Sequence, residues 1–522
     1  MKIALVNLPM VWLMNPGEIG RSLAIEYLAA VAKRDGCRVD CVDALRDRLT
    51  LAETARRLVS GDYDLVGISM TDYSLPLALE LCRELRDARF HLCLGGYGAT
   101  FWADDLLRAE PRIDSIVIGE GELTFAELLR AIGAGGDWRS TIGIAYRDGD
   151  SIVRTPPRPL IENLDDLPVP AREEPSEAEV IAASRGCYAN CSFCDIVNFY
   201  RLSPGSRVRV RTPASVAAEM ASLPERPYEF VMFVDDDFLG IERVHRGWVR
   251  ECVGELASRK VSVPFFIQSR VNDIDRGILE ALKSVGLRYV GLGIESHVPR
   301  MLKDFKKGTT PAQNLAAVAT LKELRLYYNI YFILYDAFTT LDELDENLRF
   351  LETIDYASNP AHFRKPVTAF QTLRVLPGTS MFGTYRDLGL LEKGHFEYRW
   401  RFQDPAVDDL YRTVSRWRET VVNRFLLCKP LEAGRYLRNA GLFGRARRIY
   451  LLAREFLAFD VAFIRAAVAC HRERPADHRA HETFLDTWTE RGLALVESLL
   501  EAERSAAGGQ GGETDHERAA AN

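Results

Sequence analysis

The chain has 522 residues, of which 47% are hydrophobic and 27% are charged, and its formal net charge at pH 7 is −7. At roughly 150 residues per domain, this length predicts about three folded units and excludes a single small binding module. The acidic balance gives no global attraction to nucleic acid, and no stretch of about 20 residues is free of charge, so we expect neither a nucleic-acid partner nor a membrane span. The short apolar run before Pro9 lacks the features of a signal peptide, which predicts a cytoplasmic protein.

Residues 1–140 alternate short apolar runs, such as Lys2–Leu8 and Leu65–Ser69, with amphipathic segments of helical length. This alternation predicts βαβ units and a parallel sheet, whose ligands bind at the carboxyl ends of the strands. Residues 141–175 contain a predicted hairpin followed by closely spaced prolines. Because such a proline density makes an extended, semi-rigid connector, we assign these residues to a linker between domains.

The alternation of strands and helices resumes over residues 176–390 with a new set of six predicted strands, the last at Thr368–Val375. Six strands that are each followed by a helix-sized segment predict a partial (β/α) barrel. Residues 391–504 have a helical pattern, and the Gly-rich, charged tail of residues 505–522 is predicted to be disordered.

Three cysteines lie within eight residues, directly after the first predicted strand of the second unit: Cys187, Cys191 and Cys194. Three thiolates on a short loop hold three irons of a [4Fe–4S] cluster and leave the fourth iron without a protein ligand. Zinc is the competing metal, but a structural zinc site needs four ligands, and neither a histidine nor a fourth cysteine lies near this loop. A chance triplet in a core is the third interpretation, and the spacing favours the cluster.

The motif C-x3-C-x-F-C after a strand resembles the signature of the radical S-adenosylmethionine (SAM) enzymes. The resemblance covers about residues 176–390. It implies that Cys187, Cys191 and Cys194 ligate a [4Fe–4S] cluster whose open iron chelates SAM, and that the backbone at Phe193 lies near the adenine. Reductive cleavage of SAM then yields a 5′-deoxyadenosyl radical.

Polar residues at the ends of the next strands also match this family. The resemblance implies that Asp235 and Asp236 receive the SAM amino group, that Arg270 pairs with its carboxylate, and that Glu295 and Ser296 lie near its ribose or methionine. The alternatives are a magnesium site or a solvated turn for the aspartates, and polar strand-end caps for the others.

The end of the fifth predicted strand departs from the family pattern. Many relatives have a turn containing Gly and Pro at this position, whereas this chain has Leu334-Tyr-Asp-Ala-Phe-Thr-Thr340. We therefore expect Tyr335, Asp336 and Thr339 to face the substrate.

Two pairs of glycines follow neighbouring strands of the N-terminal sheet, Gly95-Gly96 and Gly119-Glu-Gly121. Glycines at such positions let a bulky ligand approach the strand ends closely. No G-x-G-x-x-G follows the first strand, and the chain contains no GxxxxGK[ST]. A nucleotide site, a cobalamin site and a scaffold without ligand remain the three alternatives for this sheet.

Together with the downstream cysteines, these loops resemble the cobalamin-binding domain of one radical SAM subfamily. No histidine precedes His91, and the D-x-H-x-x-G motif is absent, which implies base-off cobalamin without a histidine ligand. Tyr73 is our candidate for the lower face of the cobalt. The resemblance implies cobalamin contacts from Met70, Thr71, Tyr73, Gly95, Gly96, Tyr97, Gly119, Gly121 and Glu122.

The resemblance therefore implies three α/β and helical units: a Rossmann-like (flavodoxin-like) cobalamin-binding domain, a partial (β/α)6 radical SAM barrel and a helical C-terminal domain. It implies a C-methyltransferase of specialised-metabolite biosynthesis that uses two SAM molecules. One methylates cobalamin, and the other is cleaved so that a substrate radical can take the methyl group from methylcobalamin. The implied partners are a small-molecule or carrier-bound substrate and a flavodoxin- or ferredoxin-type electron donor.

Two other functions remain open. The first keeps both cofactors but transfers no methyl group, as in relatives that catalyse oxidative cyclisation, ring contraction or rearrangement. The second is a sensor or electron-transfer protein that carries a cluster and uses the N-terminal sheet only as a scaffold. The matched strand-end motifs speak against this second function, because a scaffold needs no acidic loop at a SAM-like position.

Overall fold

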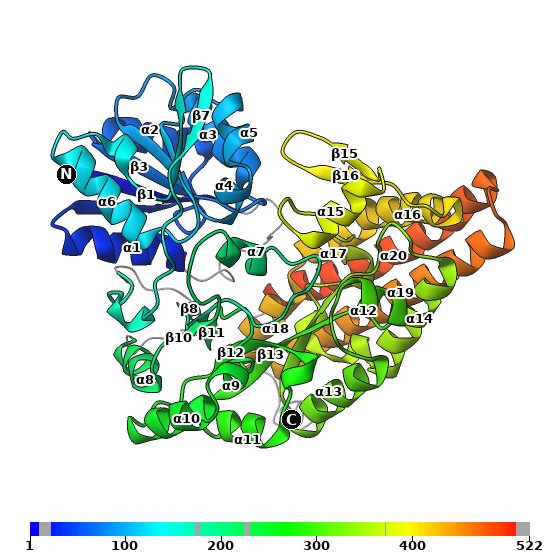
Figure 1. The fold of residues 1–522 in the computed structure, drawn as a ribbon. Helices are drawn as coiled ribbons and strands as arrows, with labels where there is room; N and C mark the ends of the chain where they lie inside the picture. The colour runs from blue at the N-terminus through cyan, green and yellow to red at the C-terminus, as the bar shows by residue number, and fades with distance from the viewer. Residues whose placement is uncertain (10–21, 173–177, 224–229, 371, 508–522) are drawn as a thin grey trace.

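The computed structural model describes residues 1–9, 22–172, 178–223, 230–370 and 372–507. Two largely parallel sheets form separate lobes, and the long C-terminal helices pack beside the second sheet (Figure 1). In the described part of the chain, none of the helices is both long and apolar enough to cross a membrane.

The N-terminal sheet has the strand order β2-β1-β3-β4-β5-β6-β7. Its first five strands are parallel, and their order 2-1-3-4-5 is that of flavodoxin-like folds. The strands are β1 (Lys2–Asn7), β2 (Arg38–Asp43), β3 (Leu65–Ser69), β4 (His91–Gly95), β5 (Ser115–Val117), β6 (Ile144–Asp148) and β7 (Ser151–Arg154). The helices are α1 (Leu23–Arg34), α2 (Leu51–Ser60), α3 (Leu75–Glu84), α4 (Tyr97–Phe101), α5 (Ala103–Ala109) and α6 (Glu122–Gly133).

The hairpin β6–β7 belongs to this sheet rather than to the linker in which we expected it. Strand β6 pairs antiparallel with β5, with Ile144 opposite Val117. Ile144 and Ala145 are fully buried, so the hairpin contributes to the core of the N-terminal domain. The N-terminal sheet therefore extends to Arg154, and the proline-rich connector begins after it.

The second sheet contains five parallel strands in the order β14-β13-β12-β11-β8. They are β8 (Ala178–Ile181), β11 (Phe230–Phe233), β12 (Phe265–Arg270), β13 (Leu287–Glu295) and β14 (Tyr327–Phe332). A short pair, β9 (Ser184–Arg185) and β10 (Arg209–Val210), flanks the cysteine loop. The helices of this part are α7 (Ile196–Arg201), α8 (Pro213–Ser222), α9 (Ile241–Val244), α10 (Trp248–Ser258), α11 (Arg276–Ser284), α12 (Pro299–Asp304), α13 (Pro311–Glu323), α14 (Leu341–Thr353) and α15 (Ser380–Asp387).

The sixth strand that we expected at Thr368–Val375 does not form in the described residues, which omit position 371. Residues 367–369 form a 3-10 turn, and an isolated parallel bridge joins Thr372 to Tyr335. The backbone N–H of Thr368 donates to the carboxylate of Asp460 at 3.0 Å, and its hydroxyl donates to the same carboxylate at 2.5 Å. This contact takes one backbone donor of the expected strand, and among the described residues the sheet has five strands.

The C-terminal part starts with a hairpin, β15 (Leu391–Lys393) and β16 (Tyr398–Trp400), which the sequence did not predict. The helical pattern predicted after it is confirmed by α16 (Pro405–Trp417), α17 (Asn423–Leu427), α18 (Pro430–Asn439), α19 (Phe443–Glu473) and α20 (His478–Ala507). These helices share one hydrophobic core with the second sheet. Residues 505–507 of the predicted disordered tail continue α20, and the rest of that tail lies outside the described residues.

Candidate active site

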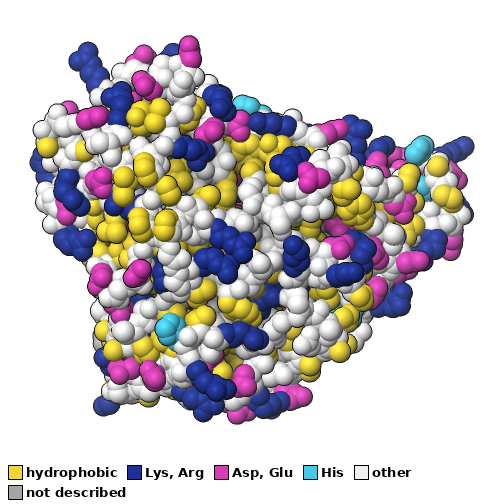
Figure 2. Space-filling view, in the orientation of Figure 1, with side chains coloured by type: hydrophobic (Ala, Val, Ile, Leu, Met, Phe, Trp, Pro, Cys, Tyr) yellow, Lys and Arg dark blue, Asp and Glu magenta, His cyan; other side chains and the backbone are white. Residues whose placement is uncertain are grey.

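A cavity of about 470 Å³ lies between the carboxyl ends of the N-terminal strands and the loops of the second domain. The N-terminal domain forms one wall of this cavity, and this wall contains eight of the nine residues that we expected to contact cobalamin: Met70, Thr71, Gly95, Gly96, Tyr97, Gly119, Gly121 and Glu122. The opposite side includes Ser184, Arg185, Tyr200 and Asp236. Several Lys and Arg side chains gather near the centre of the face drawn in Figure 2, between the two lobes. The cavity thus brings the glycine loops and the start of the cysteine loop together.

The glycines of the cavity wall are required by close backbone contacts. Gly96 has φ +98°, and a Cβ there would lie 2.5 Å from the carbonyl oxygen of Met70. Gly98, which does not line the cavity, is packed just as closely, because a Cβ there would lie 2.7 Å from the backbone carbon of Thr71. The loops after β3 and β4 therefore pack closely through their backbones at the cavity. A wall of backbone atoms lets a bulky planar ligand approach more closely than a wall of side chains would.

Tyr73, our candidate for the lower face of a corrinoid, does not line this cavity. The guanidinium of Arg374 lies over its ring, 4.2 Å from the centroid. Asp72, the residue before it, accepts a hydrogen bond from the indole of Trp102 at 3.2 Å. The loop after β3 is thus anchored by its own neighbours.

Buried ion pairs connect the two lobes beside the cavity. Arg185 pairs with Glu122 at 2.5 Å and with Glu120 at 2.8 Å, and Arg209 pairs with Glu120 at 2.7 Å. Burial works against ionisation of Glu120, but Arg185 and Arg209 hold its pKa below the usual range. Glu122, which we expected to contact cobalamin, therefore also forms the ion pair that fixes Arg185, close to the start of the cysteine loop.

The cysteine loop is fixed by backbone bonds from distant segments. Ser192 donates its N–H to the carbonyl of Phe305 at 2.9 Å and accepts from the N–H of Met381 at 2.8 Å. Phe193 packs edge-to-face on Phe305, with centroids 5.3 Å apart. The guanidinium of Arg270 lies 2.8 Å from the sulfur of Cys191. A cation is thus placed where a thiolate would need charge compensation.

The chemistry of the three thiols fits an iron–sulfur cluster. All three are half-buried and outside disulfides. Burial raises the pKa of Cys187 to about 12, so its ionisation requires a metal or another cation. Three thiolates suit a [4Fe–4S] cluster with one open iron, whereas a structural zinc site takes four protein ligands.

The acidic loop after β11 holds the cysteine loop in place. Asp235 accepts hydrogen bonds from the hydroxyl of Ser184 at 2.5 Å and from the N–H of Ala183 at 3.2 Å. Asp236 accepts from the N–H of Gly186 at 3.0 Å, and it also lines the cavity. Burial raises the pKa of Asp235 to about 6 and that of Asp236 to about 7. Of the two predicted SAM contacts in this loop, Asp236 is therefore the one that borders open space.

The predicted SAM contacts at the ends of β12 and β13 differ in where their side chains lie. Arg270 and Glu295 lie at the ends of these strands, and the carboxylate of Glu295 pairs with Lys307 at 3.1 Å. Ser296 is fully buried, and its hydroxyl contacts the amide oxygen of Asn347 at 3.2 Å. The Ser296 side chain thus lies in the core beside α14, and its position near SAM stays a prediction.

The three residues that we expected at the substrate are also buried. Tyr335 is 1% exposed and lies with its ring centroid 5.2 Å from that of Tyr411. Asp336 forms a two-pronged ion pair with Arg300 at 2.7 and 3.0 Å, and it accepts from the hydroxyl of Thr339 at 2.8 Å. These contacts organise the turn after β14, and the substrate-facing role of the three residues stays a prediction.

Three polar residues on the inner side of the second sheet were missed. The hydroxyl of Tyr331 contacts Gln268 Oε1 at 2.9 Å, and the ammonium of Lys365 lies 4.6 Å from the Tyr331 ring centroid. Burial lowers the pKa of Lys365 to about 8, although Glu295 opposes this change. Because side chains two residues apart share a strand face, Gln268 lies on the same side as Arg270. The alternation in β12 signalled Gln268, whereas no sequence pattern signalled Lys365.

Comparison with known proteins agrees with this geometry. Residues 11–129 match the B12 binding domain, and residues 181–351 match the Radical SAM superfamily. A protein of Pyrococcus horikoshii described as an uncharacterized methyltransferase, PH0819, is 30% identical over 65% of this chain and 74% of its own length. The chain belongs to the cobalamin-binding radical SAM enzymes. These two domains imply a [4Fe–4S] cluster, SAM and cobalamin as cofactors.

Other relatives of this family carry out different reactions. An anaerobic magnesium-protoporphyrin IX monomethyl ester cyclase of Rubrivivax gelatinosus is 30% identical over 62% of this chain and 60% of its own length. The fold is that of the cobalamin-dependent SAM radical enzyme OxsB, with a TM-score of 0.73, 17% identity, and coverage of 100% of this chain and 83% of OxsB. The family and the fold are thus shown, and the reaction is not decided by them.

Proposed function

We propose that this protein is a cobalamin-dependent radical SAM C-methyltransferase of specialised-metabolite biosynthesis. The observation that carries the proposal is the cavity shared by Gly96 and Gly119 on one side and by Arg185 and Asp236, beside the cysteine loop, on the other. When bound, the cluster and SAM supply a hydrogen-abstracting radical, and the corrinoid supplies the methyl group. The similarity to the Pyrococcus horikoshii methyltransferase supports methyl transfer over the other reactions.

The residues of the chain have separate tasks in this proposal. Cys187, Cys191 and Cys194 hold the cluster, and Arg270 compensates the charge of the Cys191 thiolate. Asp236 faces the cavity with an acceptor for the SAM amino group. Among the described residues that line the cavity none is a histidine, which supports base-off cobalamin without a histidine ligand.

A second function keeps both cofactors and transfers no methyl group. The relative from Rubrivivax gelatinosus, a cyclase, favours this alternative. Both functions use a small-molecule or carrier-bound substrate. We propose a cytoplasmic location and a flavodoxin- or ferredoxin-type electron donor, since the three thiols of the cysteine loop persist as thiols in a reducing compartment.

The test uses anaerobically reconstituted protein with hydroxocobalamin, SAM and a strong reductant, without substrate. We expect corrinoid binding, formation of S-adenosylhomocysteine in proportion to the bound corrinoid, and 5′-deoxyadenosine. Corrinoid binding with 5′-deoxyadenosine but without S-adenosylhomocysteine would support the non-methylating function. Absence of corrinoid binding would refute cobalamin binding by the N-terminal domain.

Replacing one thiol separates the two cofactor sites. Cys191→Ala should abolish 5′-deoxyadenosine formation and leave corrinoid binding within about twofold, because Cys191 is absent from the lining of the cavity. Cys470→Ala is the matched control, since this half-buried thiol lies on α19, away from the cysteine loop. Unchanged SAM cleavage in Cys191→Ala would refute the assignment of the cluster ligands.

A further inference from the structure

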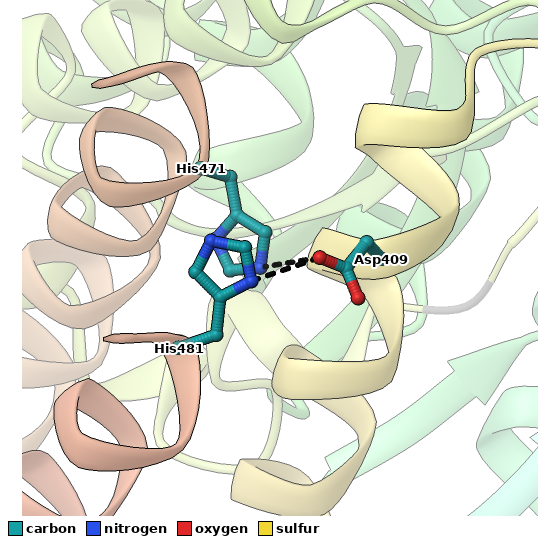
Figure 3. A group of neighbouring side chains, drawn as sticks. All are labelled: Asp409, His471 and His481. Carbon is teal, nitrogen blue, oxygen red and sulfur yellow. Dashed lines mark ion pairs between the residues drawn. The ribbon is translucent and has the colours of Figure 1, made fainter. Parts of the chain in front are cut away.

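Three helices of the C-terminal domain bring one carboxylate and two imidazoles together. Asp409 lies on α16, His471 near the end of α19 and His481 in the first turn of α20 (Figure 3). The two histidines are 1% and 4% exposed. Their ligand atoms and the Asp409 carboxylate oxygen all lie within 4.8 Å of one another. Neither the cofactor sites nor the sequence motifs account for this group.

Backbone carbonyls decide which nitrogen of each ring is free. Nδ1 of His471 lies 2.9 Å from the carbonyl oxygen of Ala467, and Nε2 of His481 lies 2.9 Å from that of Arg474. A neutral imidazole that donates to a carbonyl carries its proton on that nitrogen. The other nitrogens, Nε2 of His471 and Nδ1 of His481, therefore carry lone pairs. They lie 3.8 and 2.8 Å from Asp409 Oδ2.

This arrangement places lone pairs against one another in a buried space. Nδ1 of His481 and Oδ2 of Asp409 are buried without a hydrogen-bond partner, and the Thr413 hydroxyl lies 3.3 Å from Nε2 of His471. The two rings stack with centroids 3.7 Å apart. One proton on His481 would satisfy its contact with Asp409 only, whereas a bound cation would interact with all three atoms at once.

We propose that Asp409, His471 and His481 bind a divalent transition-metal ion, with Zn²⁺ as the ion that fits best. Two imidazole nitrogens and one carboxylate oxygen are ligands that zinc accepts. Imidazoles whose second nitrogen donates to a backbone carbonyl are the usual arrangement at metal sites. The side chain of Asp409 is 20% exposed, so water can complete the tetrahedron from the open side.

The bound ion has a structural role. It joins α16 to the turn between α19 and α20, which leaves the catalytic cavity untouched. Tyr411 lies on the same helix as Asp409, and its ring contacts Tyr335 at the end of β14. The ion thus holds the C-terminal helices against the turn that follows the radical SAM sheet.

The test uses the full chain with its cluster reconstituted, so that iron occupies the cysteine thiols. The protein is equilibrated with Zn²⁺, desalted, analysed for metal content and examined by zinc K-edge X-ray absorption. We expect one zinc per chain with a shell of N and O atoms at about 2.0–2.1 Å and without a sulfur shell at about 2.3 Å. Thermal unfolding should shift upward with Zn²⁺.

Conservative variants locate the site. Asp409→Asn and His481→Gln keep the side-chain size, and each should weaken zinc binding by at least about 100-fold in competition with a chelator, since loss of a ligand costs more than loss of its hydrogen-bond support. His478→Gln is the control, because His478 is 75% exposed and lies 3.5 Å from the other carboxylate oxygen; its effect should stay below tenfold. Cluster content and the unfolding profile without zinc confirm that each variant folds.

Three results would overturn the proposal. The first is wild-type protein that retains no zinc after desalting, which would make the group a protonated His–Asp pair. The second is a zinc spectrum dominated by sulfur, which would place the ion at cysteines. The third is zinc binding of wild-type affinity in folded Asp409→Asn and His481→Gln.

Discussion

The buried ion pairs between the lobes allow a quantitative prediction for Arg185→Met. Arg185 is 15% exposed in its side chain, and its partners Glu120 and Glu122 are 7% and 8% exposed. Without Arg185, Glu120 keeps Arg209, whereas the described structure gives Glu122 no other ion-pair partner. Removal of one member of a buried pair costs about 3–5 kcal/mol, because the remaining charge stays buried and uncompensated.

A double-mutant cycle separates this effect from lost packing. Glu122→Gln alone should cost about 1–2 kcal/mol, since Arg185 keeps its bond to Glu120. In the Arg185→Met/Glu122→Gln double variant the uncompensated carboxylate is gone. The cost of the double variant should therefore fall at least about 1.5 kcal/mol below the sum of the single costs.

The assay is urea unfolding of protein without added corrinoid, followed by tryptophan fluorescence. With a slope of about 3 kcal/mol per M, a loss of 4 kcal/mol lowers the midpoint by roughly 1.3 M. Arg154→Met is the matched control, because Arg154 pairs with Asp104 at 2.8 Å on the surface of the same domain, with side chains 45% and 41% exposed. It should cost less than about 1 kcal/mol. The reasoning fails if Arg185→Met moves the midpoint no further than Arg154→Met, or if the double variant is additive.

Three further variants test other parts of the structure. Gly96→Ala should lower the free energy of unfolding by at least about 2 kcal/mol in the protein without corrinoid, because φ is +98° and the new Cβ would lie 2.5 Å from a backbone oxygen. Gly95→Ala, whose Cβ has its nearest neighbour at 3.8 Å, should lower it by less than about 1 kcal/mol. Equal unfolding midpoints of the two variants would contradict this. Burial lowers the pKa of Lys365 to about 8. Between pH 8 and 10 the unfolded chain therefore binds one proton more than the folded chain, and the free energy of unfolding rises with pH. Over this window the free energy of unfolding of the wild type should rise by up to about 3 kcal/mol relative to that of Lys365→Met, and parallel pH profiles of the two proteins would refute this prediction. Asp336→Asn should cost about 1–3 kcal/mol, since it weakens a buried two-pronged pair with Arg300, and an unchanged melting temperature would argue against it.

The cofactor domains could be predicted because their signals are local. Cys187, Cys191 and Cys194 stand within eight residues, so a single loop carries all three thiols whatever the rest of the chain does. The glycines after β4 and β5 are likewise local, because a strand end and its turn are adjacent in sequence. Eight of the nine residues predicted at the cobalamin site accordingly line one cavity.

The directions of single side chains depended on contacts from distant parts of the chain. Ser296 was expected near SAM, but the pairing of β13 with β14 shifts its register between Gly293 and Glu295, and Asn347 of α14 lies beside the hydroxyl. Thr368, the first residue of the expected sixth strand, donates its N–H to the carboxylate of Asp460, 92 residues further along the chain. Such contacts cannot be predicted from a local sequence pattern, because hydrophobic periodicity shows which face of an element is buried and does not show which distant segment packs against it.

The sequence by itself determined the type of each domain and the family, and it predicts the cluster ligands, since spacing within a loop and alternation along a chain are short-range properties. The tertiary structure decided which polar groups meet. Asp409, His471 and His481 have no motif spacing, and they converge only because α16, α19 and α20 cross at one point. Burial leaves Asp409 Oδ2 and His481 Nδ1 without hydrogen-bond partners, and this is the observation behind the proposed ion.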